Sequence, residues 1–332
     1  MILGRVPTPL VWSCWSASVG ICMAAGLRFG IFDLLAEGEK TADDLAAATG
    51  TNLAGMDSLL KALNGFGYLK RRDEYYSNTR VTRKWLLKSS PNSISESIRF
   101  IRQLSPLFDQ LETSVRTGKT ADLHHSGQPK EFWSAYMRGL AELADYIGPE
   151  VAGKVRLASP PKRLLDVGGG HGAYAAVFCQ KYPGLQSDLL DLPEALVHAG
   201  EIVAQRSMTD RIIFRPGDLR EIDWGQRYDV VLLFSILHNL QPQEAESSLV
   251  KAYEALEPGG TVAILDSEHI KSEGNLSSTA GFNELLFFLA GNTHTYPEAT
   301  LRQWMTKAGF RGLRTRHLVA APMAVLITGQ KL

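Results

Sequence analysis

The 332-residue sequence predicts an α/β protein in which a mainly helical N-terminal part precedes a doubly wound parallel sheet. Two observations support this fold class. Helical patterns with regular stop signals fill the first half of the chain, and strand and helix patterns alternate after the prolines Pro160 and Pro161. Such alternation is typical of a sheet with helices on both faces, in which ligands bind outside the carboxyl ends of the strands.

Composition excludes several function classes. Lys and Arg together number 35 and so do Asp and Glu, which leaves no overall field to hold a nucleic acid or an anionic membrane. The three cysteines show no CxxC spacing, so neither a disulfide framework nor a zinc site is expected. We therefore expect no bound metal and a reducing, cytoplasmic compartment. The length favours two domains.

The stretch from residue 6 to residue 27 carries no charge, which raises the question of a signal peptide or a membrane span. Two prolines and several serines and glycines interrupt its apolar residues, and an amphipathic pattern follows it. A buried interface helix is the favoured interpretation. We expect a homodimer that forms through these N-terminal helices, and no membrane span.

Residues 1–90 are expected to form a helical, winged-helix-like dimerisation domain. Thr41 is placed to begin one helix and Gly50 to end it, a second helix follows, and residues 71–87 are expected to form a two-stranded ribbon. This order of elements raises a second function class, a DNA-binding regulator. The candidate recognition helix, 52–63, has Lys61 as its one cation, so burial in a subunit interface explains it better than contact with phosphates.

Residues 91–158 are expected to form a helical linker that also lines a pocket. Phe132, Tyr136 and Met137 recur at helical neighbour spacing, a pattern that fits either a core or the wall of an apolar pocket. His124 and His125 are expected to lie in a polar loop with no functional role.

Residues 159–332 are expected to form the ligand-binding domain. Its first strand is expected to end at the glycines of DVGGGHG, and a helix follows it. The further strands are expected at 187–193, 212–219, 228–237 and 261–269, with helices at 171–183, 194–206 and 243–256. Two β-rich runs end the chain.

The glycine loop identifies the ligand only in combination with other residues. Gly168 and Gly170 allow a tight turn and close approach of the backbone to a ligand. Together with Ala173 they also satisfy a dinucleotide-binding pattern in which Asp191 is the ribose-binding acid, so a nicotinamide oxidoreductase is a rival interpretation. Asp218 after the third strand, at a position suited to an adenine amino group, favours another cofactor.

The segments DVGGGHG, LLDLP, GDLRE, ILHN and EALEPGG, in this order behind a helical winged region, resemble S-adenosylmethionine-dependent O-methyltransferases of the small-molecule type. That family includes the caffeic acid and hydroxyindole methyltransferases, and the resemblance covers nearly the whole chain. It implies a Rossmann-like class I methyltransferase core, a dimer with interlocked N-terminal helices, and binding of S-adenosyl-L-methionine, with S-adenosyl-L-homocysteine as product.

The resemblance also implies a set of cofactor-binding positions. The glycine loop would pass the amino acid part of the cofactor, Asp191 would accept both ribose hydroxyls, and Asp218 with Leu219 would bracket the adenine. The full set expected to bind the cofactor is Asp166, Gly168, Gly170, Asp191, Leu192, Asp218, Leu219 and Ser235.

In that family, the histidine at the position of His238, at the end of the fourth strand, removes the proton from the acceptor hydroxyl. The chemistry fits, because a phenol with a pKa near ~10 is a poor nucleophile until a base such as imidazole accepts its proton. Asp266, which ends the fifth strand, and Glu268 are expected to orient this base. The chain departs from the family at Phe234, where a lysine is frequent.

A second departure is Thr295, where plant members carry an acid, and its loss weakens the case for base catalysis. The segment 281–290 matches the acceptor-pocket helix of the family. The residues expected to bind substrate are Phe132, Tyr136, Met137, Asn239, Phe282, Asn283 and Leu286. We expect methyl transfer to a hydroxyl of an aromatic or polycyclic small molecule of secondary metabolism. Transfer to carbon or nitrogen, or a member without transfer activity, is the alternative.

Overall fold

The computed structural model describes residues 8–125, 127–157, 159–267 and 278–332, with the side chains of residues 8–15 and 278 left aside. The chain forms two compact units, Met1–Leu104 and Ser105–Leu332. The finer division expected from the sequence, at residues 90 and 158, stays a prediction.

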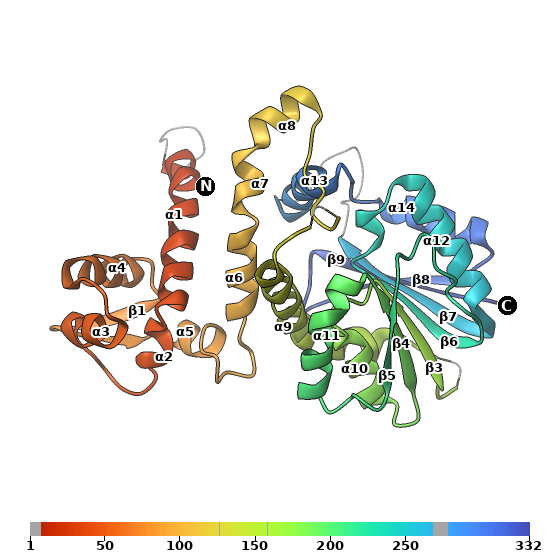
Figure 1. The fold of residues 1–332 in the computed structure, drawn as a ribbon, viewed down its shortest axis with the longest axis horizontal. Coiled ribbons are helices and arrows are strands. Elements are labelled where there is room, and N and C mark those ends of the chain that lie inside the picture. Colours follow the sequence, from red (N-terminus) through yellow and green to blue (C-terminus); the bar gives the residue numbers. More distant parts are fainter. Residues whose placement is uncertain (1–7, 126, 158, 268–277) are drawn as a thin grey trace. The chain divides into compact units, whose positions relative to one another are not determined.

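The first unit is mainly helical (Figure 1). Its elements are α1 (Thr8–Arg28), α2 (Ile31–Leu34), α3 (Ala42–Thr49), α4 (Leu53–Gly65), β1 (Leu69–Arg72), β2 (Tyr75–Asn78), α5 (Arg80–Trp85) and α6 (Ser95–Gln103). Helices α3 and α4 followed by the antiparallel ribbon β1–β2 give the winged-helix arrangement that the sequence predicted.

Local capping chemistry explains the limits of these helices. Thr41 and Asp44 form a reciprocal capping box at the start of α3, and Gly50 ends this helix in the left-handed conformation. The prediction of a ribbon extending to residue 87 is wrong beyond Asn78. The Thr79 side chain accepts a hydrogen bond from the Thr82 backbone and thereby begins helix α5 instead.

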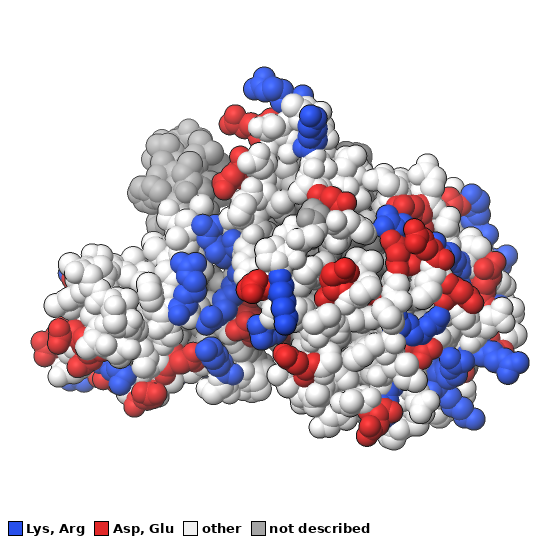
Figure 2. Space-filling view, viewed as in Figure 1, with Lys and Arg blue, Asp and Glu red and all other residues white. Residues whose placement is uncertain are grey.

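The candidate recognition helix α4 buries Met56, Leu60 and Leu63 in the core of the first unit. Its one lysine, Lys61, is bonded to Asp57 at 2.6 Å. On the face shown in Figure 2, acidic and basic side chains of the described residues are interspersed rather than gathered into a basic stripe. None of the described helices is long and apolar enough to cross a membrane.

The second unit contains a seven-stranded sheet of order β5-β4-β3-β6-β7-β9-β8. Its strands are β3 (Arg163–Val167), β4 (Gln186–Asp191), β5 (Ile212–Pro216), β6 (Tyr228–Phe234), β7 (Leu256–Ser267), β8 (Arg311–His317) and β9 (Ala324–Gln330). Strands β3 to β7 are parallel, whereas β9 runs antiparallel to both β7 and β8.

Helices cover both faces of this sheet (Figure 1). The helices that pack on the sheet are α9 (Lys130–Lys154), α10 (Ala173–Lys181), α11 (Pro193–Gln205), α12 (Pro242–Ala255) and α14 (Glu298–Ala308). The second unit also contains α7 (Ser105–Asp109), α8 (Leu111–Thr117) and α13 (Ser278–Gly291). Along β6, Val230 and Leu232 pack with α9, α10 and α11, while Val231 and Leu233 pack with α12 and α14. The strand is apolar throughout because both of its faces are buried, which confirms the doubly wound prediction.

Substitution of Val231 by alanine tests the importance of this central strand. The Val231 side chain is fully buried, so its truncation removes two methyl groups from a packed core and should lower the free energy of unfolding by about 2 kcal/mol. Val319→Ala is the matched control because Val319 is 87% exposed. Denaturant titration of both variants measures the difference, and equal stabilities would contradict the assignment.

Candidate active site

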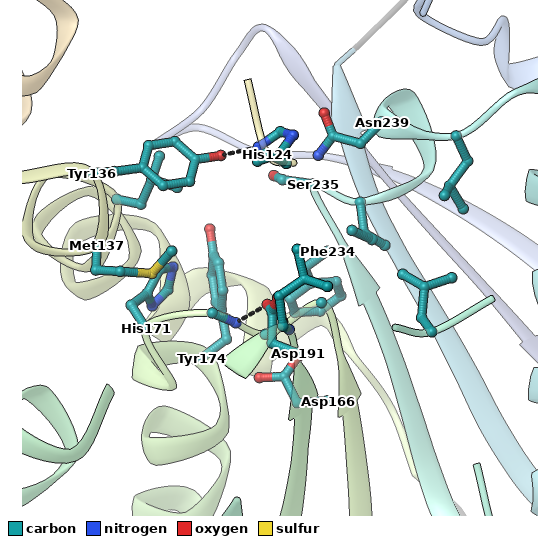
Figure 3. Close-up of a pocket in the computed structure, with 18 of the residues that line it drawn as sticks. His124, Tyr136, Met137, Asp166, His171, Tyr174, Asp191, Phe234, Ser235 and Asn239 are labelled. Atoms are coloured by element: carbon teal, nitrogen blue, oxygen red, sulfur yellow. Dashed lines mark hydrogen bonds between the residues drawn. The ribbon is translucent and has the colours of Figure 1, made fainter. Parts of the chain in front are cut away.

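A cavity lies at the carboxyl ends of β3, β4, β5 and β6, where a doubly wound sheet is expected to bind its ligand (Figure 3). Its volume, with the open mouth included, is about 1210 Å³. Every residue that was expected to bind a cofactor lines it: Asp166, Gly168, Gly170, Asp191, Leu192, Asp218, Leu219 and Ser235.

The glycine loop between β3 and α10 requires residues without side chains. Gly168 has φ +66°, and a Cβ atom there would lie 2.6 Å from Ile236. Gly170 has φ +45°, and its backbone N–H donates to Asp191 Oδ2 at 2.7 Å. The loop is thus held against the end of β4, with its backbone facing the cavity.

One buried carboxyl group, Asp166, and one half-buried carboxyl group, Asp191, lie against this loop. Burial, together with the charge of Asp191, raises the pKa of Asp166 to about 7. Neither carboxyl oxygen of Asp166 has a hydrogen-bond partner among the described residues. Burial also raises the pKa of Asp191 to about 6, although the amides of Leu192 and Gly170 bind its two oxygens. Two carboxyl groups at a cavity wall, one of them without a hydrogen-bond partner, suit a ligand that carries positive charge or donates hydrogen bonds.

Strand β6 ends at Phe234, four residues before His238. The sequence had indicated a strand that continues to His238. Ser235 adopts φ +52°, a left-handed conformation that is uncommon for a residue other than glycine. This turn directs the chain into a short 3₁₀ helix, Leu237–Asn239, which contains His238. Strained backbone at a strand end is a frequent feature of functional sites.

His238 is bonded to Asp266, the residue that was expected to orient it. The distance from His238 Nδ1 to Asp266 Oδ1 is 2.6 Å, and the same oxygen accepts the Ser267 amide at 2.7 Å. The ring of Phe287 stacks on the imidazole with 3.9 Å between ring centres. His238 is therefore fixed both in its plane and on one face. It does not itself line the cavity, whereas its neighbour Asn239 does. Glu268 lies outside the described residues.

Helix α9 supplies Tyr136 and Met137 to the cavity wall, as expected from the sequence (Figure 3). His124 was expected to lie in a polar loop away from any site, and the structure places it at the cavity instead. His124 lies in the loop before α9, lines the cavity, and is bonded to the Tyr136 hydroxyl at 3.2 Å. Burial, and then the nearby His238, lower its pKa to about 4, so this imidazole is neutral at physiological pH. His125 lines the cavity as well.

The remaining expected substrate residues lie away from the described cavity wall. Phe132 stacks on Tyr136, and Phe282 is 45% exposed and stacks on Phe108. The Asn283 amide donates to Ser267. Leu286 is half-buried on the same helix, α13. Binding of substrate by these side chains stays a prediction.

The position of the missing second acid is occupied by a different arrangement. The backbone amide and the hydroxyl of Thr295 both donate to Glu284 on α13. The other oxygen of Glu284 is paired with His294 at 2.7 Å. The Glu284 carboxylate is thus hydrogen-bonded at the position of Thr295, although it belongs to α13.

Sequence reasoning missed several residues that line the cavity. His171 and Tyr174 follow the glycine loop directly, so their proximity to it was a usable signal. His125 and Arg220 also face the cavity, and only the fold brings them there. Trp133, which shares the helical spacing of Phe132, Tyr136 and Met137 and was expected with them in a core or a pocket wall, lines the cavity as well. Among the described residues, no group of three or more metal-ligating side chains lies together.

Comparison with known proteins gives a consistent result. A family model described as an O-methyltransferase domain matches residues 116–311, and one described as an O-methyltransferase dimerisation domain matches residues 16–89. The 3-hydroxy-5-methyl-1-naphthoate 3-O-methyltransferase of Streptomyces sahachiroi is 27% identical over 98% of this chain and 94% of its own length.

Two further similarities concern chemistry and fold. The L-tyrosine C(3)-methyltransferase of Streptomyces lavendulae is 26% identical over 91% of this chain and 86% of its own length. The crystal structure of human N-acetylserotonin methyltransferase in complex with S-adenosylmethionine has a TM-score of 0.86 at 21% identity. That alignment covers 100% of this chain and 99% of the human one.

The pH dependence of stability tests the state of Asp166. Because folding raises its pKa from 3.8 to about 7, its contribution to stability is complete below about 3.8 and is lost as the pH rises through 7. Asp166→Asn is neutral throughout, so its melting temperature should fall less between pH 5 and pH 8 than that of the wild type.

Scanning fluorimetry without ligand measures both melting temperatures. Asp210→Asn, at an exposed position, is the matched control and should follow the wild type. Parallel curves for Asp166→Asn and the wild type would show that Asp166 is ionised in the folded protein across this range.

Proposed function

The chain belongs to the O-methyltransferase family, with its dimerisation domain ahead of its O-methyltransferase domain, and from this we propose its reaction. It transfers a methyl group from S-adenosyl-L-methionine to a hydroxyl of an aromatic or polycyclic small molecule. The observation that carries the proposal is the buried pair of His238 and Asp266 beside a cavity whose wall holds every residue expected to bind the cofactor.

The cavity suits this cofactor in chemistry and in shape. The buried Asp166 carboxyl group at the cavity wall would favour the cationic amino acid part through its charge, and the glycine loop leaves room for close approach. Asp191 would accept hydrogen bonds from the ribose hydroxyls, and Asp218 with Leu219 would hold the adenine. When bound, the sulfonium supplies an activated methyl group and leaves as the neutral thioether of S-adenosyl-L-homocysteine. Such a transfer needs no metal ion.

His238 acts as the general base in this proposal. Nδ1–H of His238 donates a hydrogen bond to the Asp266 carboxylate, which leaves the lone pair of Nε2 available. As the acceptor oxygen forms its bond to the methyl carbon, its proton moves to Nε2, and Asp266 stabilises the resulting imidazolium. Phe287 keeps the ring in one plane, so the base needs no reorientation during the reaction.

The acceptor is proposed to be a flat aromatic molecule. Trp133, Tyr136 and Met137 give the cavity an apolar wall on the side of α9. The relative from Streptomyces sahachiroi is named for a naphthoate substrate, which is consistent with a fused ring. The C-methyltransferase relative supports transfer to carbon as the second candidate, because an electron-rich aromatic carbon next to a hydroxyl uses the same base.

We further propose that the protein works as a homodimer through its N-terminal unit. The match to a dimerisation domain over residues 16–89 supports this. So do large apolar side chains that are 44–47% exposed in the first unit, among them Ile21, Phe29 and Leu53. Large exposed apolar side chains in one unit are a frequent feature of subunit interfaces.

Transfer of labelled methyl groups tests the reaction and its base together. Methyl-labelled S-adenosylmethionine is incubated with a panel of phenols, quinols, aromatic amines and fused-ring hydroxy acids. His238→Ala should lower the rate of labelling of a hydroxyl by roughly a hundredfold or more, the usual contribution of a general base.

The control for this experiment is His317→Ala, since His317 is exposed on β8. It should label the acceptor at the wild-type rate. Labelling of a hydroxyl that survives His238→Ala would remove the base role, and labelling of carbon or nitrogen alone would replace O-methylation.

Asp266→Asn tests the orientation of the base. The asparagine amide would donate to Nδ1 and force the ring proton onto Nε2, where a base needs its lone pair. The turnover number should fall roughly a hundredfold or more. The dissociation constant of S-adenosylhomocysteine, measured by calorimetry, should stay unchanged. Unchanged turnover would mean that Asp266 has only a structural part.

A further inference from the structure

The adenosine end of the cavity contains a cluster of charged side chains that the proposed reaction does not use. Arg220 comes two residues after Asp218 and lines the cavity with it. Among the described residues of the cavity wall, Arg220 is the single arginine or lysine. The other ionisable members of this cluster are His125, from the loop before α9, and Glu244, from α12.

Arg220 binds the whole carboxylate of Asp218. Its Nε atom lies 2.9 Å from Oδ1 and 3.1 Å from Oδ2, and its Nη2 atom lies 2.5 Å from Oδ2. The Arg220 backbone amide also donates to Oδ1, at 2.9 Å. Bidentate pairing of this kind fixes the plane of a carboxylate as well as its position. The hydrogen bonds from Arg220 lower the pKa of Asp218, so the group remains ionised.

The guanidinium group is itself held from two sides. Nη2 lies 3.0 Å from His125 Nε2, and Nη1 lies 3.6 Å from Glu244. Lys251 binds the backbone oxygens of Leu219 and Arg220, at 2.9 and 2.7 Å. The segment 218–220 is therefore fixed through both its side chains and its backbone.

The hydrogen bonds leave the carboxylate one direction in which to accept another donor. A carboxylate has about four lone-pair sites, and three N–H groups bind this one: the backbone N–H on Oδ1, the Nη2–H on Oδ2, and the Nε–H shared between the two oxygens and closer to Oδ1. With the shared Nε–H counted once, one site remains on Oδ2, the oxygen that His125 also approaches, at 3.9 Å. A ligand group that donates a hydrogen bond to Oδ2 would bind better than one that only accepts. A ligand acceptor would leave the charged oxygen without a partner and would be repelled by it.

We propose that Arg220 is a positioning residue that holds the Asp218 carboxylate in the orientation that recognises the amino group of adenine. The inference rests on the proposed function, in which Asp218 binds the adenine. Without Arg220 the carboxylate rotates and rehydrates, and it loses its preference for a donor.

Calorimetric titration with two ligands tests this role directly. The first is S-adenosylhomocysteine, and the second is S-inosylhomocysteine, in which a carbonyl oxygen replaces the adenine amino group. The wild type should bind the adenosyl ligand tighter by roughly tenfold or more, the value of a hydrogen bond to a charged group. In Arg220→Met this ratio should fall below about threefold, mainly through weaker binding of the adenosyl ligand.

Three further variants separate positioning from damage to the fold. Arg314→Met, at an exposed position of β8 outside this cavity, should keep the wild-type ratio. Asp218→Asn should shift the preference toward the inosyl ligand, since an amide can donate to its carbonyl. Adding Arg220→Met to Asp218→Asn should change the ratio no further, because Arg220 acts through Asp218.

The outcomes distinguish this inference from the proposed function. Equal binding of the two ligands by the wild type would overturn the adenine assignment of Asp218 and the inference with it. Discrimination in the wild type that persists in Arg220→Met would overturn the inference alone. Loss of discrimination in Arg220→Met, with a wild-type melting temperature and no further effect in the double variant, establishes Arg220 as the positioning residue.

Discussion

The parallel register of the central strands places the side chains of the proposed site at one edge of the sheet. Asp166 on β3 lies level with Leu232 on β6, and Phe234 at the end of β6 lies level with Leu265 on β7. Asp191 ends β4, beside the glycine loop. Since all of these strands run in one direction, the residue that follows each of them enters the same space. The helices that pack on both faces keep this edge open and leave it as the place for a ligand.

Electrostatics at this edge favour a cationic ligand with several donors. Burial and the charge of Asp191 raise the pKa of Asp166, and burial and the charge of Asp218 raise the pKa of Asp191. Burial prevents water from relieving this cost. In the proposed function, a sulfonium cofactor with an ammonium group would bring positive charge to Asp166 and hydroxyl donors to Asp191. Binding of such a ligand would therefore relieve the electrostatic cost of the free site.

The sequence predicted those parts of the fold and site that depend on local patterns. Three acidic residues lie at or next to the ends of apolar strands, and such strand ends can be located from the sequence pattern. They are Asp166, Asp191 and Asp218. The loop that carries His124 and His125 could not be assigned in this way. It reaches the cavity because the amides of Ala121 and Leu123 bind carbonyl groups at the end of α13, more than 160 residues away in the chain. The end of the ribbon at Asn78 was missed because a single capping threonine decided it.

The position of His238 shows how backbone geometry and packing combine to fix the side chain that we propose as the base. A strand that continued to residue 238 would alternate its side chains between the two faces of the sheet, into cores that are already filled. The left-handed turn at Ser235 ends the strand, and the 3₁₀ helix that follows brings Nδ1 of His238 to Asp266 on the neighbouring strand. Phe287 then covers one face of the ring, so the plane of the imidazole and the direction of Nε2 are fixed by the fold itself. Such preorganisation is what a proton transfer coupled to in-line attack requires, because the base must meet the hydroxyl without a further rearrangement.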